Sequence, residues 1–391
     1  MSFNLACKKA EKDAASLFRK IEAVSEFNAK KVLYAFKKNS VSETCFAPTT
    51  GYGYNDKGRE VFDAVFAEIF GAEAAIAGYS FISGTHTIAN ALFALLDKND
   101  LLLSATGEPY DTLSSFINEF NFDKVEIDEL AKLKKKLKKK PKILFIQRSR
   151  GYMIRRTLSI SDIARLVQLT KEISPNTIVF VDNCYGEFCE KLEPADVGAD
   201  IVCGSLIKNP GGGIALSGGY VAGRRDLIEK CAVRMTVPNI GREAGCNPVG
   251  YRELFQGLFL APHTVSQALK TAVYTARLTE LLGFSPDPSY KTPRSDIIQT
   301  ITFNNEKALL EFIRGIQKYS PVDSHLTPEP WEMPGYADKV IMAAGTFVQG
   351  ASIELSADAP IRPPYAAFIQ GGLTYESGKL TITKTLESIC T

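Results

Sequence analysis

The chain has 391 residues, of which 45% are hydrophobic and 23% charged, and it carries a net charge of +2 at pH 7. This length can bury a large core and predicts two domains, while the balanced charge argues against a general attraction to nucleic acid or to a membrane surface. No apolar run approaches the ~20 residues that span a bilayer, and the eight cysteines and three histidines lack zinc-binding spacing, so we expect a cytoplasmic protein without a metal site.

The N-terminal part of the chain predicts helices. Over residues 3–38 apolar side chains recur at helical spacing, with Lys and Glu between them, which is typical of a helical arm. A loop rich in glycine and tyrosine follows at 42–58. A second apolar stripe over 61–70 predicts a helix that ends at Gly71.

Beyond this point strands and helices alternate. Helical periodicity recurs over 83–96, 112–120 and 160–173, and short apolar runs predict strands over 74–76, 100–104, 143–147, 177–181 and 201–204. This alternation predicts an α/β fold, with a large, mostly parallel sheet covered by helices on both faces. Active sites in such sheets lie beyond the carboxyl ends of the strands.

The C-terminal part predicts a second, smaller α/β unit. A long helix is expected over 251–282, and three prolines just beyond it mark a boundary. Strands are expected near 296–303, 340–347 and 352–355. We therefore predict three parts, which are a helical arm (1–50), a large domain (51–283) and a small domain (284–391).

The one compositionally biased segment is a lysine-rich run at 132–142. Such a run can bind a polyanion, but Leu133 and Leu137 lie one helical turn apart and the rest of the chain is not basic. We interpret the run as the solvated end of a helix and expect no nucleic-acid partner.

Lys208 and Asp182 are the most informative residues. Each follows a short apolar strand and stands among small or polar residues. An amine and a carboxylate at the ends of two buried strands suit pyridoxal phosphate (PLP), because the amine can form a Schiff base while the acid keeps the pyridine nitrogen protonated. Burial is expected to lower the pKa of Lys208. The alternatives are a lysine that contacts phosphate without covalent chemistry and an aspartate that caps a turn.

Other residues could complete such a site. Ser83, Gly84 and Thr85 precede a helical run, where backbone N–H groups and hydroxyls can bind phosphate, and Ser205 could reach the same phosphate. The alternative for the first three is an ordinary helix cap. Tyr110 follows a strand and could stack on the cofactor ring or belong to the core.

Three arginines and a tyrosine are further candidates. Tyr54 and Arg59, in and just after the glycine-rich loop, could bind phosphate. Arg362, held between prolines, and Arg242 could each bind a substrate carboxylate. The alternative for Tyr54 and Arg59 is a surface loop that pairs with nearby acids, and the alternative for Arg362 is an ordinary surface-loop arginine. His86 could cap its helix or face the cofactor.

With these residues in place, the chain resembles the family of methionine γ-lyase-like or aluminium-resistance proteins, relatives of cystathionine β-lyase among the fold type I PLP enzymes. The resemblance spans most of the chain, in the stretches Phe81–His86, Thr106–Thr112, Val181–Phe188, Gly204–Gly213, Gln256–His263, Met333–Tyr336, Ser352–Asp358 and Gln370–Thr374.

The resemblance implies roles for these residues. Lys208 would form the Schiff base, Asp182 would pair with the pyridinium and Tyr110 would stack on the ring, while phosphate would be bound by Ser83, Gly84, Thr85 and Ser205. In the wider group a Tyr and an Arg from the neighbouring subunit complete the phosphate site, and the nearest equivalents are Tyr54 and Arg59, at a different spacing. The group also implies a homotetramer built from tight dimers.

The chain departs from the wider group at two places. Gln147–Tyr152 replaces the usual Asn-Pro pair, and Ile207 precedes the lysine where Thr is frequent. Both replacements alter the pocket. From the resemblance we expect a PLP-dependent carbon–sulfur lyase acting on a sulfur-containing amino acid of the cystathionine, cysteine or methionine type. The alternatives are another PLP enzyme of amino-acid metabolism, such as an aminotransferase, aldolase or decarboxylase, and a non-catalytic sensor with the same fold.

Overall fold

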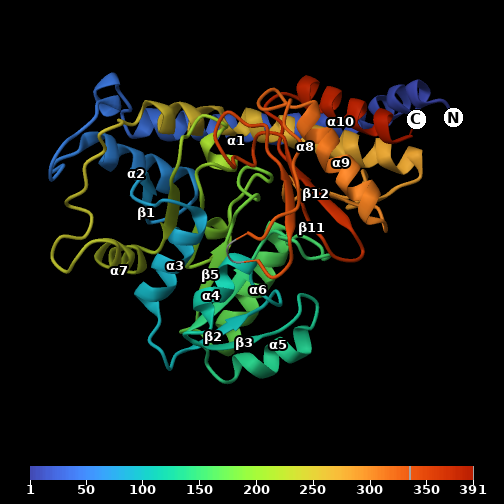
Figure 1. Cartoon of the computed structure of the whole chain (residues 1–391). Helices are drawn as coiled ribbons and strands as arrows, with labels where there is room; N and C mark the ends of the chain where they lie inside the picture. Colours follow the sequence, from blue (N-terminus) through green and yellow to red (C-terminus); the bar gives the residue numbers. More distant parts are fainter. Residues whose placement is uncertain (334–335, 391) are drawn as a thin grey trace.

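The computed structural model describes residues 1–333 and 336–390, which form two β-sheets with helices around them (Figure 1). Pro334 and Gly335, which belong to one of the stretches quoted above, and the C-terminal Thr391 lie outside the described residues.

The larger sheet has seven strands in the order β1-β7-β6-β5-β4-β2-β3. Strand β7 runs antiparallel to both of its neighbours, and the pairs from β6 to β3 are parallel. The strands are β1 (Ala74–Gly78), β2 (Leu101–Ser104), β3 (Asn121–Lys124), β4 (Ile143–Gln147), β5 (Ile178–Asp182), β6 (Ile201–Ser205) and β7 (Gly219–Gly223).

Helices cover both faces of this sheet, as the alternation predicted. In β4, Leu144 and Ile146 join the core under α2 (Lys57–Ile69) and α6 (Ile160–Ile173), whereas Ile143 and Phe145 join the core under α3 (Gly84–Leu95) and α7 (Arg225–Met235). Alternate side chains of a strand point to opposite faces, so a strand buried on both sides is apolar throughout.

Two short helices pack on opposite faces of the sheet, one in each of these cores. They are α4 (Ser114–Ile117), which is shorter than the predicted 112–120 helix, and α5 (Leu130–Leu137). In α5, Leu133 and Leu137 are buried, and Lys132 and Lys136 pair with Glu129 and Asp123. The lysine-rich run is thus a solvated helix face with local acidic partners.

The smaller sheet has five antiparallel strands in the order β10-β11-β12-β9-β8. They are β8 (Ser285–Asp287), β9 (Gln299–Thr302), β10 (Val340–Ala343), β11 (Ser356–Pro360) and β12 (Ala366–Gln370), with α9 (Glu306–Lys318) and α10 (Tyr375–Cys390) against one face. The predicted strand at 352–355 is wrong. Those residues turn, because the Glu354 carboxylate accepts hydrogen bonds from the N–H groups of Phe347 and Val348.

Two long helices run side by side along the molecule (Figure 1). They are α1 (Phe3–Lys38) and α8 (Arg252–Leu282), and both agree with the predicted ranges. The start of α1 joins the core of the small sheet through Ala6 and Ala10, and its end joins the core of the large sheet through Val32 and Ala35. In the part of the chain that the structure describes, no helix combines the length and apolar character needed to cross a bilayer.

Candidate active site

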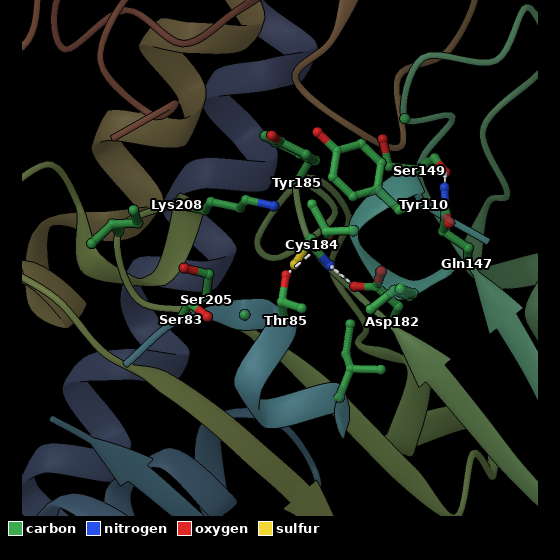
Figure 2. Close-up of a pocket in the computed structure, with 16 residues that line it drawn as sticks. Ser83, Thr85, Tyr110, Gln147, Ser149, Asp182, Cys184, Tyr185, Ser205 and Lys208 are labelled. Carbon is green, nitrogen blue, oxygen red and sulfur yellow. Dashed lines mark hydrogen bonds between the residues drawn. The ribbon is translucent and has the colours of Figure 1, made fainter. Parts of the chain in front are cut away.

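Seven of the predicted site residues line one cavity at the carboxyl ends of the large sheet (Figure 2). Asp182 is the last residue of β5, and Lys208 follows the end of β6. The seven residues are Ser83, Gly84, Thr85, Tyr110, Asp182, Ser205 and Lys208. The structure therefore brings these seven residues together where the strands end.

One end of the cavity is formed by the first turn of α3. Ser83 caps this helix, and its Oγ accepts a hydrogen bond from the His86 N–H at 3.1 Å. A Cβ atom on Gly84 would lie 3.1 Å from the Ser205 Cβ, so the backbone approaches Ser205 more closely than a larger residue would allow. Backbone N–H groups at a helix start, next to hydroxyls, form a site that suits a phosphate group. The His86 Nδ1 accepts the N–H of Ile82 at 3.2 Å, so His86 serves the local turn.

The opposite end of the cavity contains Asp182. Its Oδ1 accepts the Cys184 N–H at 3.1 Å (Figure 2), and within the described residues it has no Lys or Arg partner at ion-pair distance. Burial raises the pKa of Asp182, although the nearby Lys208 offsets part of that rise. A buried carboxylate in this state would be stabilised by a cationic ring nitrogen.

Lys208 points into the cavity with its ammonium near an aromatic face. Its Nζ lies 3.9 Å from the centroid of the Tyr185 ring. Burial disfavours the ammonium form, but the acidic groups of Cys184, Tyr185 and Asp182 outweigh burial and raise the pKa of Lys208. The prediction that burial would lower this pKa is therefore wrong. It considered desolvation alone and not the acids that the fold gathers around the amine.

Tyr110 stands between the cavity and the small sheet. Its ring lines the cavity, and its hydroxyl lies 2.7 Å from the Tyr336 hydroxyl. Burial raises the pKa of Tyr110 well above its usual value. Gly151 has a φ of +56°, and a Cβ there would lie 3.0 Å from the Tyr110 Cδ2, so a glycine at this position leaves room for the ring.

The structure adds cavity residues that were not predicted as site residues. They include Gln147, Ser149, Cys184 and Tyr185. The Gln147 Nε2 donates to the Ser149 carbonyl at 3.1 Å, and its Oε1 has no hydrogen-bond partner within the described residues (Figure 2). Gln147 ends a buried strand just as Asp182 does, so its position in the sequence carried the same signal.

A buried acid lies directly behind the cavity. Glu187 Oε1 accepts the Tyr220 hydroxyl at 2.8 Å, and a Cβ on Gly204 would lie 2.6 Å from the same oxygen. Burial raises the pKa of Glu187 to about 8. Glu187 therefore borders the β6 end that leads to Lys208, and near neutral pH it is largely uncharged.

Four predicted residues lie outside this cavity. Arg59 donates to the carbonyls of Gly53, Gly245 and Glu243, which ties its guanidinium to the backbone of its own chain. Tyr54 is exposed and stacks on Tyr52 with 5.4 Å between ring centroids. A role for Tyr54 and Arg59 at the phosphate site of a neighbouring subunit stays a prediction.

The two candidate carboxylate-binding arginines have acidic partners. Arg242 binds Asp63 through two hydrogen bonds of 2.7 and 2.9 Å, and Arg362 pairs with Asp338 at 2.8 Å in a more exposed position. Neither lines the cavity that contains Lys208. Their assignment to the substrate carboxylate stays a prediction, and the geometry gives each a structural partner instead.

The whole chain can be compared with known proteins. Residues 3–390 match the methionine gamma-lyase family. The chain belongs to this family. It is 48% identical over 399 residues to the uncharacterised protein YnbB of Bacillus subtilis, covering 97% of this chain and 95% of the relative.

Two solved structures match this member of the methionine gamma-lyase family over nearly the whole chain. A Listeria innocua protein, named as a candidate cystathionine beta-lyase involved in aluminium resistance, is 46% identical with a TM-score of 0.96 and covers 99% of both chains. A Clostridium novyi protein, named as a carbon-sulfur lyase involved in aluminium resistance, is 46% identical with a TM-score of 0.95, covering 99% of this chain and 96% of the other.

Structures with much lower sequence identity share the overall fold of the chain. A pyridoxal-5'-phosphate-dependent protein of Escherichia coli matches with a TM-score of 0.66 and 17% identity, covering 94% of this chain and 97% of the other. Yeast cystathionine gamma-lyase matches with a TM-score of 0.62 and 16% identity, covering 92% and 98%. The chain therefore has the fold of the fold type I PLP enzymes, as its sequence predicted.

Proposed function

We propose that the chain is a PLP-dependent lyase that eliminates a thiol from a sulfur-containing amino acid of the cystathionine, cysteine or methionine type. The observation that carries this proposal is the single cavity that brings together Lys208, Asp182 and the start of α3. Membership of the methionine gamma-lyase family supports the choice of a carbon–sulfur bond.

The residues of the cavity fit the cofactor. Lys208 would attach it covalently, Asp182 would pair with its ring nitrogen, and Tyr110 would lie against its ring. Its phosphate would be bound by the first turn of α3 and by the hydroxyl groups of Ser83, Thr85 and Ser205. The close approach of Gly84 to Ser205, where a Cβ atom would be crowded, is the feature that favours a phosphate bound by backbone N–H groups.

Bound PLP supplies an electron sink for negative charge at the α-carbon of an amino acid. Lys208 would remove the proton from that carbon, which requires its neutral amine. A protonated ring nitrogen beside Asp182 would neutralise the carboxylate that stabilises the Lys208 ammonium. The pKa of Lys208 would then fall, which favours the neutral amine. Tyr110 and Tyr185 would shield the reacting atoms from water.

The proposal is tested by replacing Lys208 with alanine. We expect the variant to lose the visible absorbance of the bound cofactor. It should also release keto acid and ammonia ~10²–10⁴-fold more slowly, which is the usual contribution of a positioned base. Lys135→Ala on the exposed face of α5 is the matched control, with both properties unchanged. A Lys208→Ala protein that keeps its colour and its rate would overturn the proposal.

The same assay separates the alternatives. Release of ammonia and keto acid without an added amino acceptor distinguishes a lyase from an aminotransferase. A purified chain that does not bind PLP at all would instead indicate a non-catalytic protein that retains the fold.

We also propose a cytoplasmic homotetramer built from tight dimers. All eight cysteines are unpaired in the structure, which suits a reducing compartment. The exposed Tyr52–Tyr54 pair on the glycine-rich loop suits a contact between subunits. Light scattering of the purified protein tests the assembly, and a monomer would contradict it.

A further inference from the structure

The face of the small sheet that looks toward the active-site cavity carries a carboxylate. In β11, Ala357 and Ala359 point into the core beneath α9 and α10. The alternation of side chains therefore places Asp358 on the opposite face. Phe368, which pairs with Asp358 in the neighbouring strand β12, lies on that face too and packs against Tyr152 of the large-sheet part.

Aromatic side chains surround this position. Tyr110, Tyr152 and Tyr336, here called the tyrosine cluster, have ring centroids 5.7 to 6.0 Å from one another. The Tyr152 ring also lies 5.3 Å from the ring of Phe368. Because Tyr110 lines the Lys208 cavity, the cluster connects that cavity to the face of the small sheet.

Asp358 is buried there, and none of the residues that the structure describes gives it a cationic partner at ion-pair distance. It is 6% exposed, and its Oδ2 accepts a hydrogen bond from the Gln370 Nε2 at 2.8 Å. Within the described residues its Oδ1 has no hydrogen-bond partner, and the same is true of the buried Tyr152 hydroxyl. Burial raises the pKa of Asp358 to about 6, and the Gln370 amide, the nearby Tyr152 hydroxyl, which does not reach hydrogen-bonding geometry, and Lys208 offset part of the rise.

This combination has the chemistry of an ammonium-binding site. A buried carboxylate without a partner is unfavourable, and a cation that reaches it restores the missing interaction. Aromatic faces attract the same cations through their ring quadrupoles. A purely apolar group would gain from the rings but not from the free carboxylate oxygen, and an anionic group would be repelled by both.

Lys208 does not serve as that cation. Its Nζ lies over the Tyr185 ring, the acids that raise its pKa most are Cys184, Tyr185 and Asp182, and no ion pair joins it to Asp358. In the proposed function its amine is also committed to the cofactor and to the α-carbon. The α-amine of the substrate is likewise engaged at the cofactor, so the cation must be a second one.

We propose that Asp358 and the tyrosine cluster bind a second ammonium group of the substrate, carried by the half that leaves as a thiol. This inference rests on the proposed function and narrows its substrate class. It selects sulfur compounds with an amino-acid group at both ends, of the cystathionine or cystine type, over methionine, whose leaving half is an uncharged methanethiol.

The test compares two thioethers that differ only in the second ammonium group. They are L-cystathionine and S-(3-carboxypropyl)-L-cysteine, in which hydrogen replaces the distal amine. A hydrogen bond to a charged group predicts a ratio of kcat/KM of about 10- to 150-fold in favour of cystathionine for the wild-type enzyme. We expect Asp358→Asn to reduce this ratio to within about threefold.

Asp323→Asn is the matched control for this experiment. Asp323 is an exposed residue that follows α9, with a φ of +52°, a conformation that asparagine also tolerates, so the same chemical change there should keep the wild-type ratio. A wild-type kcat/KM ratio near one overturns the inference, even if Asp358→Asn does not fold. A folded Asp358→Asn protein that keeps the preference for cystathionine overturns it too. Failure to cleave any thioether overturns the proposed function itself, which is a separate outcome.

Discussion

Removing the charge of Asp182 should change two quantities in opposite directions, raising the stability of the cofactor-free protein and weakening its affinity for PLP. In Asp182→Asn the amide oxygen can still accept the Cys184 N–H that Oδ1 accepts at 3.1 Å, so the local turn is kept. Only the charge is removed. Because burial raises the pKa of Asp182, its ionised form is unfavourable in the cofactor-free fold.

The sign for stability follows from proton linkage. A buried acid with a raised pKa takes up protons on folding, so its penalty is absent below the pKa of the unfolded chain, about 4, and grows as pH rises toward the folded pKa. The cofactor-free Asp182→Asn protein should therefore melt at a higher temperature than wild type at pH 7. The difference should shrink as the pH approaches 4.

The sign for cofactor binding is the reverse. A hydrogen bond to a charged partner contributes about 1.5–3 kcal/mol, so the loss of the Asp182 charge should weaken PLP binding by about 10- to 150-fold. Equilibrium dialysis with PLP and thermal unfolding of the cofactor-free protein measure the two effects, with Asp323→Asn as control. A less stable cofactor-free variant, or PLP affinity within threefold of wild type, would refute the reasoning.

Two further substitutions test neighbouring parts of the structure. Arg242→Ala removes both hydrogen bonds to the mostly buried Asp63. It should cost about 3 kcal/mol of unfolding free energy and lower the melting temperature. A change confined to the KM for the substrate would instead favour a carboxylate-binding role. Glu187→Gln should remove a pH dependence. Between roughly pH 5 and 8 the unfolded chain ionises this carboxyl while the fold, where its pKa is about 8, keeps it protonated, so the wild type should lose up to about 1.4 kcal/mol of unfolding free energy per pH unit. Parallel denaturation curves of the two proteins across that range would contradict the second expectation.

The parts of the fold that could be read from the sequence are those with strong local periodicity. The ranges of α1, α6, β4 and α8 were predicted almost residue by residue, because each buries a regular apolar pattern. The short edge strand β3 was missed, since its sequence Asn-Phe-Asp-Lys has no buried residue. The strand β11 was placed four residues early, because the apolar pattern of 352–355 gives no sign that Glu354 turns back to the N–H groups of Phe347 and Val348.

The candidate site divides in the same way. Lys208 and Asp182 could be recognised because each ends a buried strand, and parallel strands bring such ends together. Asp358 and Tyr336 could not, because they approach the cavity only through the position of the small sheet. The direction of the Lys208 pKa shift was also beyond reach, since it depends on which acids the folded chain collects around one amine.

The paired helices α1 and α8 have a consequence for how the molecule comes apart. Asp13 and Glu22 of α1 bind Arg277 and Lys270 of α8, and α1 contributes side chains to the hydrophobic interiors of both sheets. If the core of one sheet unfolds, α1 loses part of its packing, and the core of the other sheet then loses the side chains that α1 contributes to it. The two sheets should therefore unfold in one cooperative step, because the N-terminal helix packs against both of them.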